Sequence, residues 1–123
     1  MSKATKIKWL VKPEEHDYPA AASYLNLMFD EQAAKGLVEK LRKAPVVSFK
    51  AKDIFRASAL SLLGVSNSHV AKDRRKIKAK TFLSPLLLVR DTGNRRVIIA
   101  DGYHRLCAVY SVSEDALIPC KIV

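Results

Sequence analysis

The residues of this chain best suited to chemistry form one run, Asp101-Gly102-Tyr103-His104-Arg105. Glycine permits a sharp turn and a close approach of the backbone to a ligand. The first amides of a helix have no partner within the helix and lie at the positive end of its dipole, so a helix beginning here would attract an anion. His104 and Arg105 add donors in the same turn, and a guanidinium can bind a phosphate through two parallel hydrogen bonds. The run is therefore suited to binding an anion, but taken alone it favours a simpler interpretation, in which Asp101 only caps the helix and Arg105 is a solvated surface residue.

This turn needs a strand before it and a helix after it. Residues 97–100 are apolar and typical of a buried strand, and residues 103–111 have apolar residues at helical spacing. Another apolar run, residues 86–90, is separated from the first by turn-forming residues 91–94, which predicts a hairpin. Two further strand candidates are residues 46–49 and 118–123. Strands and helices that interleave in this way predict a small mixed sheet flanked by helices, in the α/β (α+β) class.

The chain of 123 residues is predicted to form a single compact domain with a helical addition at its N-terminus. Residues 1–16 are interpreted as a loosely held basic leader. Asp17 is placed near the N-cap of a first helix, and Asp30 at the start of a second. We therefore divide the chain into a leader and helical cap, residues 1–45, and a main domain, residues 46–123.

The composition is strongly basic, with 22 Lys and Arg against 12 Asp and Glu and a net charge of +10. This balance favours a polyanionic partner such as nucleic acid or nucleotide phosphates, although it also keeps many small bacterial proteins soluble. The longest apolar run is strand-sized and no signal-peptide pattern is seen, so we expect no membrane partner. Cys107 and Cys120 lack metal-ligand spacing, which predicts free thiols in a cytoplasmic protein.

A helix expected at about residues 69–79 carries a dense cluster of basic charge, opposed only by Asp73. The six cations of this cluster are Lys72, Arg74, Arg75, Lys76, Lys78 and Lys80. Such a density suits a nucleotide or a nucleic-acid backbone, while a solvated helix face is the plainer interpretation for most of them. His16 and His69 are expected to be cap or surface residues rather than ligands.

Residues 99–108, Ile-Ala-Asp-Gly-Tyr-His-Arg-Leu-Cys-Ala, resemble the signature of the ParB/sulfiredoxin superfamily. In that superfamily a Gly-x-His-Arg or Gly-Glu-Arg-Arg segment after a strand binds nucleotide phosphates at a helix N-terminus. The similarity continues in order through Asp-Arg-Arg-Lys-Ile at residues 73–77, Ser-Pro-Leu-Leu-Leu-Val at 84–89 and Ile-Pro-Cys-Lys-Ile-Val at 118–123. It covers residues 46–123 and implies a stand-alone ParB/sulfiredoxin-like domain.

The resemblance also implies a set of phosphate ligands. Gly102 and the backbone amides of Tyr103 and His104 would cradle a phosphate, and Arg105 would clamp it. Lys76 matches a lysine of the sulfiredoxin-like helix and would be a further ligand. The ligand implied is a nucleoside diphosphate or triphosphate with Mg²⁺.

The resemblance implies catalytic residues less directly than it implies phosphate ligands. Asp101 would orient the turn or approach the metal, for which the sequence shows no cluster of protein ligands. A free-serine kinase of the same fold uses a glutamate near its first strand as a base, and the nearest carboxylate here is Asp53. Arg56 stands where members of the superfamily often place a substrate or phosphate contact.

Three departures from the family pattern bear on function. Tyr103 occupies the position of the catalytic cysteine of sulfiredoxins, and a phenol cannot form the sulfur–phosphate bond, so sulfiredoxin activity is not expected. The same position is a glutamate in ParB partition proteins. Those proteins also add a helix-turn-helix and a dimerisation domain, so we do not expect this chain to be a partition protein by itself.

The leading hypothesis is a ParB-like nucleotide-binding domain, with nucleotide hydrolysis or phosphotransfer left open. The alternative is a DNA-binding, partition-related or ParB-type nuclease module that acts through the basic helix. A salt titration of DNA binding would separate the two. The nucleotide base, and whether the protein is a homodimer, are left open by the sequence.

Overall fold

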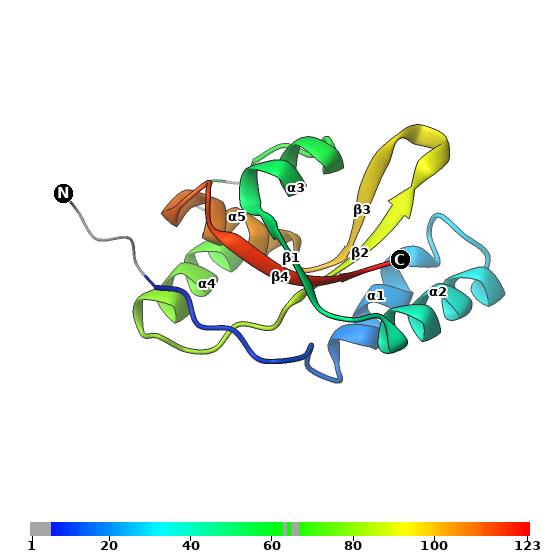
Figure 1. Ribbon diagram of the computed structural model, residues 1–123, viewed down its shortest axis with the longest axis horizontal. Coiled ribbons are helices and arrows are strands. Elements are labelled where there is room, and N and C mark those ends of the chain that lie inside the picture. The colour runs from blue at the N-terminus through cyan, green and yellow to red at the C-terminus, as the bar shows by residue number, and fades with distance from the viewer. Residues whose placement is uncertain (1–5, 63, 65–66) are drawn as a thin grey trace.

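The computed structural model describes residues 6–62, 64 and 67–123, which form a four-stranded sheet between two layers of helices (Figure 1). The strands are β1 (Val47–Lys50), β2 (Leu86–Asp91), β3 (Arg96–Asp101) and β4 (Leu117–Ile122). Their order is β1-β4-β2-β3, with β4 and β2 parallel and the two outer pairs antiparallel. This confirms the predicted mixed sheet and the α+β class.

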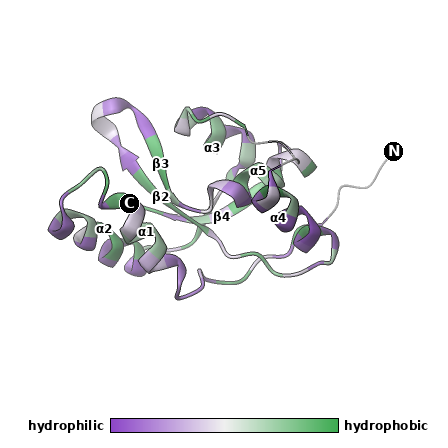
Figure 2. Ribbon diagram, turned by 180° about the vertical axis from the view of Figure 1, so that it is seen from behind, coloured by the Kyte–Doolittle hydropathy of each residue, from purple (hydrophilic) through white to green (hydrophobic). Residues whose placement is uncertain are grey.

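The five helices are divided between the faces of the sheet. They are α1 (Asp17–Leu25), α2 (Glu31–Lys43), α3 (Ala51–Ser58), α4 (Ser68–Lys78) and α5 (Tyr103–Val112). Helices α1 and α2 cover one face and α3, α4 and α5 the other (Figure 1). The sheet is largely hydrophobic along its central strands and hydrophilic at the tip of the β2–β3 hairpin (Figure 2).

The central strand β2 shows why the sheet is covered on both faces. Leu86 and Leu88 pack into the core beneath α3, α4 and α5, whereas Leu87 and Val89 pack into the core beneath α1 and α2. Successive side chains of a strand point to opposite faces, so an apolar run without alternation needs a hydrophobic layer on each side. The N-terminal helices are therefore part of the core structure.

The start of α1 agrees with the sequence, which placed Asp17 near the N-cap. The N-cap position is His16, without a side-chain capping hydrogen bond, and Asp17 is the first helical residue and is buried. In contrast, Asp30 caps α2 as expected, because its carboxylate accepts a hydrogen bond of 2.8 Å from the amide of Ala33. The Asp17 carboxylate instead accepts a hydrogen bond from Ser84, in a distant part of the chain.

The segment before α1 is also more ordered than a loose leader. The Leu10 amide donates to the Leu83 carbonyl, and the Leu83 amide donates to the Lys8 carbonyl, both at 2.8 Å. Ile7 and Trp9 pack against the core under α4 and α5. The expectation of a loosely held leader is therefore wrong for residues 6–16, because two apolar side chains anchor it; residues 1–5 lie outside the described part.

The described helices include none long and apolar enough to span a membrane.

Candidate functional site

A cavity of about 220 Å³ lies where β3 ends and α5 begins. Four segments line it: residues 14–17 before and at the start of α1, one side of α4, residues 82–84, and the β3–α5 turn. The fifteen lining residues are Glu14, His16, Asp17, His69, Lys72, Asp73, Lys76, Phe82, Leu83, Ser84, Asp101, Gly102, Tyr103, His104 and Arg105. We call this the α5 cavity. It brings together six predicted site residues from the β3–α5 turn and α4, together with Lys72.

Gly102 is required by the geometry of the turn. It has a φ of +107° and occupies the N-cap position of α5, where no side chain caps the helix. A Cβ at this position would lie 2.7 Å from Cγ of Leu86, so any other residue would clash as well as adopt an unfavourable conformation. The close approach lets α5 start at once after β3 and puts its uncapped N-terminus at the cavity.

Arg105 lies in the cavity wall with only 15% of its side chain exposed. Its Nη1 donates to the Ser84 carbonyl at 2.5 Å and to the Pro85 carbonyl at 3.3 Å, and its Nη2 donates to Asp101 Oδ2 at 3.1 Å. The guanidinium also lies 3.9 Å from the carboxylate of Asp17. Arg105 is therefore not a solvated surface residue. It is also not a clamp whose two terminal nitrogens are both available to a ligand.

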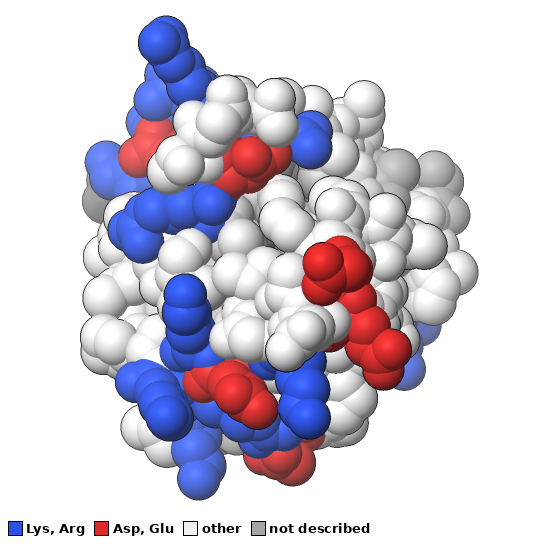
Figure 3. Space-filling view, turned by 90° about the vertical axis from the view of Figure 1, so that its right-hand side faces the viewer, with Lys and Arg blue, Asp and Glu red and all other residues white. Residues whose placement is uncertain are grey.

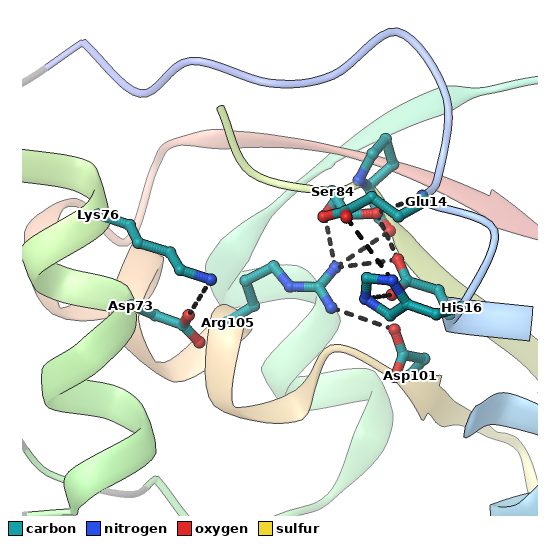
Figure 4. Close-up of polar contacts among 9 residues, drawn as sticks. Glu14, His16, Asp73, Lys76, Ser84, Asp101 and Arg105 are labelled. Atoms are coloured by element: carbon teal, nitrogen blue, oxygen red, sulfur yellow. Dashed lines mark hydrogen bonds and ion pairs between the residues drawn. The ribbon is translucent and has the colours of Figure 1, made fainter. Parts of the chain in front are cut away.

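Figure 4 shows the direction in which the Arg105 side chain points. The guanidinium points from α5 toward Ser84, His16 and Asp101, away from Lys76 and Asp73 on α4. The phosphate clamp expected from the sequence stays a prediction, since in the structure the terminal nitrogens of Arg105 join three segments of the protein.

Ser84 connects the N-terminal segment to this wall. Its hydroxyl donates a short hydrogen bond to Asp17 Oδ2 and accepts one of 3.0 Å from the Glu14 amide. His16 lies within ion-pair distance of two carboxylates, at 3.3 Å from Asp17 and 3.7 Å from Glu14. Ser84, Asp17, Arg105 and Asp101 therefore form a continuous polar network, which we call the Arg105 wall.

The network changes the acid–base behaviour of Asp101. Burial, opposed by the Arg105 guanidinium and reinforced by the charge of Asp17, raises the pKa of the Asp101 carboxyl above its usual value. A carboxyl that is bonded to a guanidinium and has a raised pKa holds the turn in place. The expectation that Asp101 orients the turn or approaches a metal stays a prediction.

The opposite wall is formed by α4, whose start after Asn67 is stabilised by hydrogen bonds from the amides of His69 and Val70 to the Asn67 side chain. Lys72 and Lys76 line the cavity from this helix. Lys76 Nζ lies 3.9 Å from Asp73, and Lys72 has no ion pair within the described part of the chain. We call Lys72, Asp73 and Lys76 the α4 wall; its two lysines are the cations best placed to receive an anion.

Two histidines lie between the walls. The rings of His69 and His104 are 4.8 Å apart between centroids. Burial, with a smaller effect from His69, lowers the pKa of His104, so its imidazole is neutral near pH 7. A neutral imidazole still provides one N–H donor.

The remaining cations of the basic helix do not face this cavity. Arg74 donates to the Ser111 hydroxyl at 2.5 Å, on the side of α4 that packs near α5. Arg75 and Lys78 are exposed on α4, and Lys80 follows the helix in a left-handed conformation with a φ of +60°. The helix therefore divides its charge between the cavity and the solvent.

Two predicted site residues lie elsewhere. Asp53 and Arg56 are on α3 and are hydrogen-bonded to each other at 3.0 Å, as expected for positions three apart on a helix. Neither of them lines the α5 cavity. The structure does not bring them together with the turn that was expected to bind phosphate.

Eight lining residues were not among the site residues predicted from the sequence: Glu14, His16, Asp17, His69, Asp73, Phe82, Leu83 and Ser84. A signal existed for the first three, because a cluster of titratable residues directly before a helix is unusual in a segment read as a flexible leader. His69 gave no such signal, and only the packing of α4 on α5 places it beside His104.

The charges of the cavity are close to balanced. Four carboxylates, two lysines, one arginine and three histidines line it. Elsewhere, the face shown in Figure 3 has basic side chains above and below a mostly uncharged band, with acidic side chains among them. The net charge of +10 is therefore not gathered into one continuous patch on that face.

Comparison with protein-family models, with curated proteins and with solved structures found no match to this chain. The fold and the site together define a three-layer α+β domain with a polar, charged cavity at a strand–glycine–helix turn. Within the described residues, no group of three or more His, Cys, Asp or Glu could hold a metal ion by itself.

Proposed function

We propose that the α5 cavity binds the phosphates of a nucleotide, as in the ParB/sulfiredoxin superfamily that residues 99–108 resemble. The observation that carries this proposal is the position of the lysines: Lys72 and Lys76 line the same cavity as the uncapped N-terminus of α5. A helix N-terminus with two nearby cations is a favourable environment for an anion.

Each part of the cavity has a role in this proposal. The turn amides at Gly102, Tyr103 and His104 bind phosphate oxygens, and Lys72 and Lys76 neutralise their charge. Arg105 supports these groups by fixing the turn to residues 84–85 and to Asp101. The cavity volume of about 220 Å³ suits the phosphates, with the rest of the nucleotide at its mouth.

A nucleotide would bring Mg²⁺ with its phosphates, where the ion neutralises charge and polarises the phosphoryl group. Such an ion needs only one or two protein carboxylates. Asp73 and Asp101 line the cavity, and Asp73 is the better candidate because Asp101 is bonded to Arg105. Asp53 lies outside the cavity, so a phosphotransfer step that uses it as a base is not part of the proposal.

The test is isothermal titration calorimetry with nucleoside diphosphates and triphosphates, each with and without Mg²⁺. We expect the double variant Lys72→Gln/Lys76→Gln to bind at least tenfold more weakly, about 1.4 kcal/mol. The control is Lys78→Gln, which removes the same charge from the same helix outside the cavity. Equal affinities of the double variant and the control would contradict the proposal.

A titration of DNA binding against salt tests the alternative. Binding to a nucleic-acid backbone weakens steeply with salt and depends on the exposed cations of α4, whereas a nucleotide site depends on Mg²⁺ and on the base. Loss of DNA binding in Lys78→Gln, without any measurable nucleotide binding, would favour the DNA-binding module and reject the nucleotide site.

A further inference from the structure

A second cavity lies on the other side of the N-terminal segment. It has a volume of about 500 Å³ and is lined by residues 10–15, by Tyr18 of α1, by Arg42 of α2 and by Lys121 of β4. We call it the Tyr18 cavity. Glu14 lines both cavities.

Lys121 is the most unusual group in this cavity. Only 8% of the residue is exposed, and its Nζ donates one hydrogen bond of 2.7 Å to the Arg42 carbonyl. The Tyr18 ring, with its centroid 5.8 Å from Nζ, gives a further weak cation–π contact. An ammonium has three donors, and no carboxylate within the described residues forms an ion pair with this one. A buried cation satisfied by a single carbonyl can accept an anionic partner.

Arg42 supplies a second cation beside the same ring. Its guanidinium carbon lies 4.3 Å from the centroid of Tyr18, and its Nη1 is 2.5 Å from the carboxylate of Glu15. The Glu15 side chain is 78% exposed, and an ion pair at such a position contributes little to stability. A carboxylate from outside the protein can therefore replace it at little cost.

The remaining lining consists of the charged residues Lys12 and Glu14 and of apolar residues. Leu10, Val11 and Pro13 line the cavity together with the Tyr18 ring, and Val11 is 91% exposed. An apolar chain that covers Val11 would remove hydrophobic surface from water, which favours binding. The lining thus combines cations with apolar side chains, which suits an amphipathic ligand.

We propose that the Tyr18 cavity binds a small organic carboxylate with an apolar chain. The carboxylate takes the place of Glu15 at Arg42 and accepts a second hydrogen bond from Lys121, and the chain packs on Tyr18, Leu10 and Val11. Binding involves no covalent step. This inference is independent of the nucleotide proposal, because it uses neither the turn at Gly102 nor the lysines of α4.

The probe is hexanoate, and its uncharged match is hexanamide. Both are titrated into the ¹⁵N-labelled protein, and the shifts of its backbone amide resonances are followed by NMR. We expect hexanoate to shift the resonances of Leu10, Val11 and Tyr18 and to bind at least tenfold more tightly than hexanamide. Equal binding of the two probes, or shifts that do not include these residues, would overturn the proposal.

Variants test whether the ligand carboxylate competes with Glu15 for Arg42. Glu15→Gln releases Arg42 and should strengthen hexanoate binding severalfold, whereas Arg42→Gln should weaken it at least tenfold. Lys40→Gln on the exposed side of α2 is the control and should leave the affinity unchanged. Because Glu15 and Arg42 are at the surface, these variants should stay folded even if Lys121→Met does not. An unchanged affinity in both Glu15→Gln and Arg42→Gln would reject the site.

Discussion

The two walls of the α5 cavity use their charges in different ways. In the Arg105 wall, the guanidinium is buried and bonded to two carbonyls and a carboxylate. In the α4 wall, Lys76 Nζ lies 3.9 Å from Asp73, and Lys72 has no ion pair with any residue that the structure describes. A buried charge needs a partner within the protein. A lysine whose ammonium group reaches solvent is hydrated instead, and a ligand can replace this water.

The residue most typical of a phosphate clamp, Arg105, is thus bonded within the protein, whereas Lys72 and Lys76 line the cavity from the neighbouring helix. The arginine of the turn stabilises the site, and the lysines of the neighbouring helix give it charge. Four experiments test this division of roles.

The largest effect is expected from Arg105→Met. The substitution leaves the carboxylates of Asp101 and Asp17 without their cation in a buried wall, and breaking such a pair costs about 3 kcal/mol. Urea unfolding followed by circular dichroism measures the loss. Lys76→Gln is the control on the other wall and should change the unfolding free energy by less than about 0.5 kcal/mol. Similar losses of unfolding free energy in both variants would mean that the two walls do not differ in how strongly their charges stabilise the fold.

Gly102→Ala should be the next most destabilising change, at about 2 kcal/mol, since it adds a Cβ 2.7 Å from Leu86 Cγ at a positive φ. Gly36→Ala is a matched control inside α2, where a Cβ meets no atom within 4 Å. That change should stabilise the protein by about 0.5 kcal/mol, because alanine is the better helix former. Thermal unfolding of the two variants would show shifts of opposite sign; a shift of the same sign would contradict the close packing of the turn.

The pKa of Asp101 offers a smaller, pH-dependent test of the Arg105 wall. Burial raises this pKa, so the contribution of Asp101 to stability is complete below its ordinary value of about 3.9 and is lost as the pH rises through the raised value. A titration of the side-chain carboxyl by ¹³C NMR should therefore give a midpoint above 3.9. Arg105→Gln should raise the midpoint further, because the guanidinium lowers the pKa. A fall in the midpoint would show that Arg105 does not pair with Asp101 in solution.

The smallest expected effect concerns His104, between the walls. Its pKa is lowered, so its contribution to stability is complete above the ordinary value of about 6.5 and is lost as the pH falls through the lowered value. Inorganic phosphate bound at the α5 turn should raise this pKa, and His69→Gln should raise it slightly without phosphate. Imidazole resonances followed by NMR against pH measure both changes. A pKa that phosphate leaves unchanged would place the anion away from His104.

Local patterns determined most of the fold. The apolar runs at β2 and β3, the turn between them and the helical spacing after Gly102 are short-range properties, and the structure has these elements within one or two residues of their predicted bounds. Gly102 could also be predicted, because a strand that turns directly into a helix needs a residue tolerant of a positive φ. The expected resemblance of residues 99–108 to the ParB/sulfiredoxin superfamily rests on local sequence in the same sense, and it stays a prediction.

Only the tertiary structure decided which charges are paired. Asp17 and Ser84 are 67 positions apart, and no local pattern predicts that they meet beside Arg105. Likewise, Asp53 and Arg56 are close in sequence to β1 but lie on a helix that does not line the α5 cavity. Whether a charged side chain binds a ligand or supports the fold depends on the groups that surround it after folding, and those come from every part of the chain.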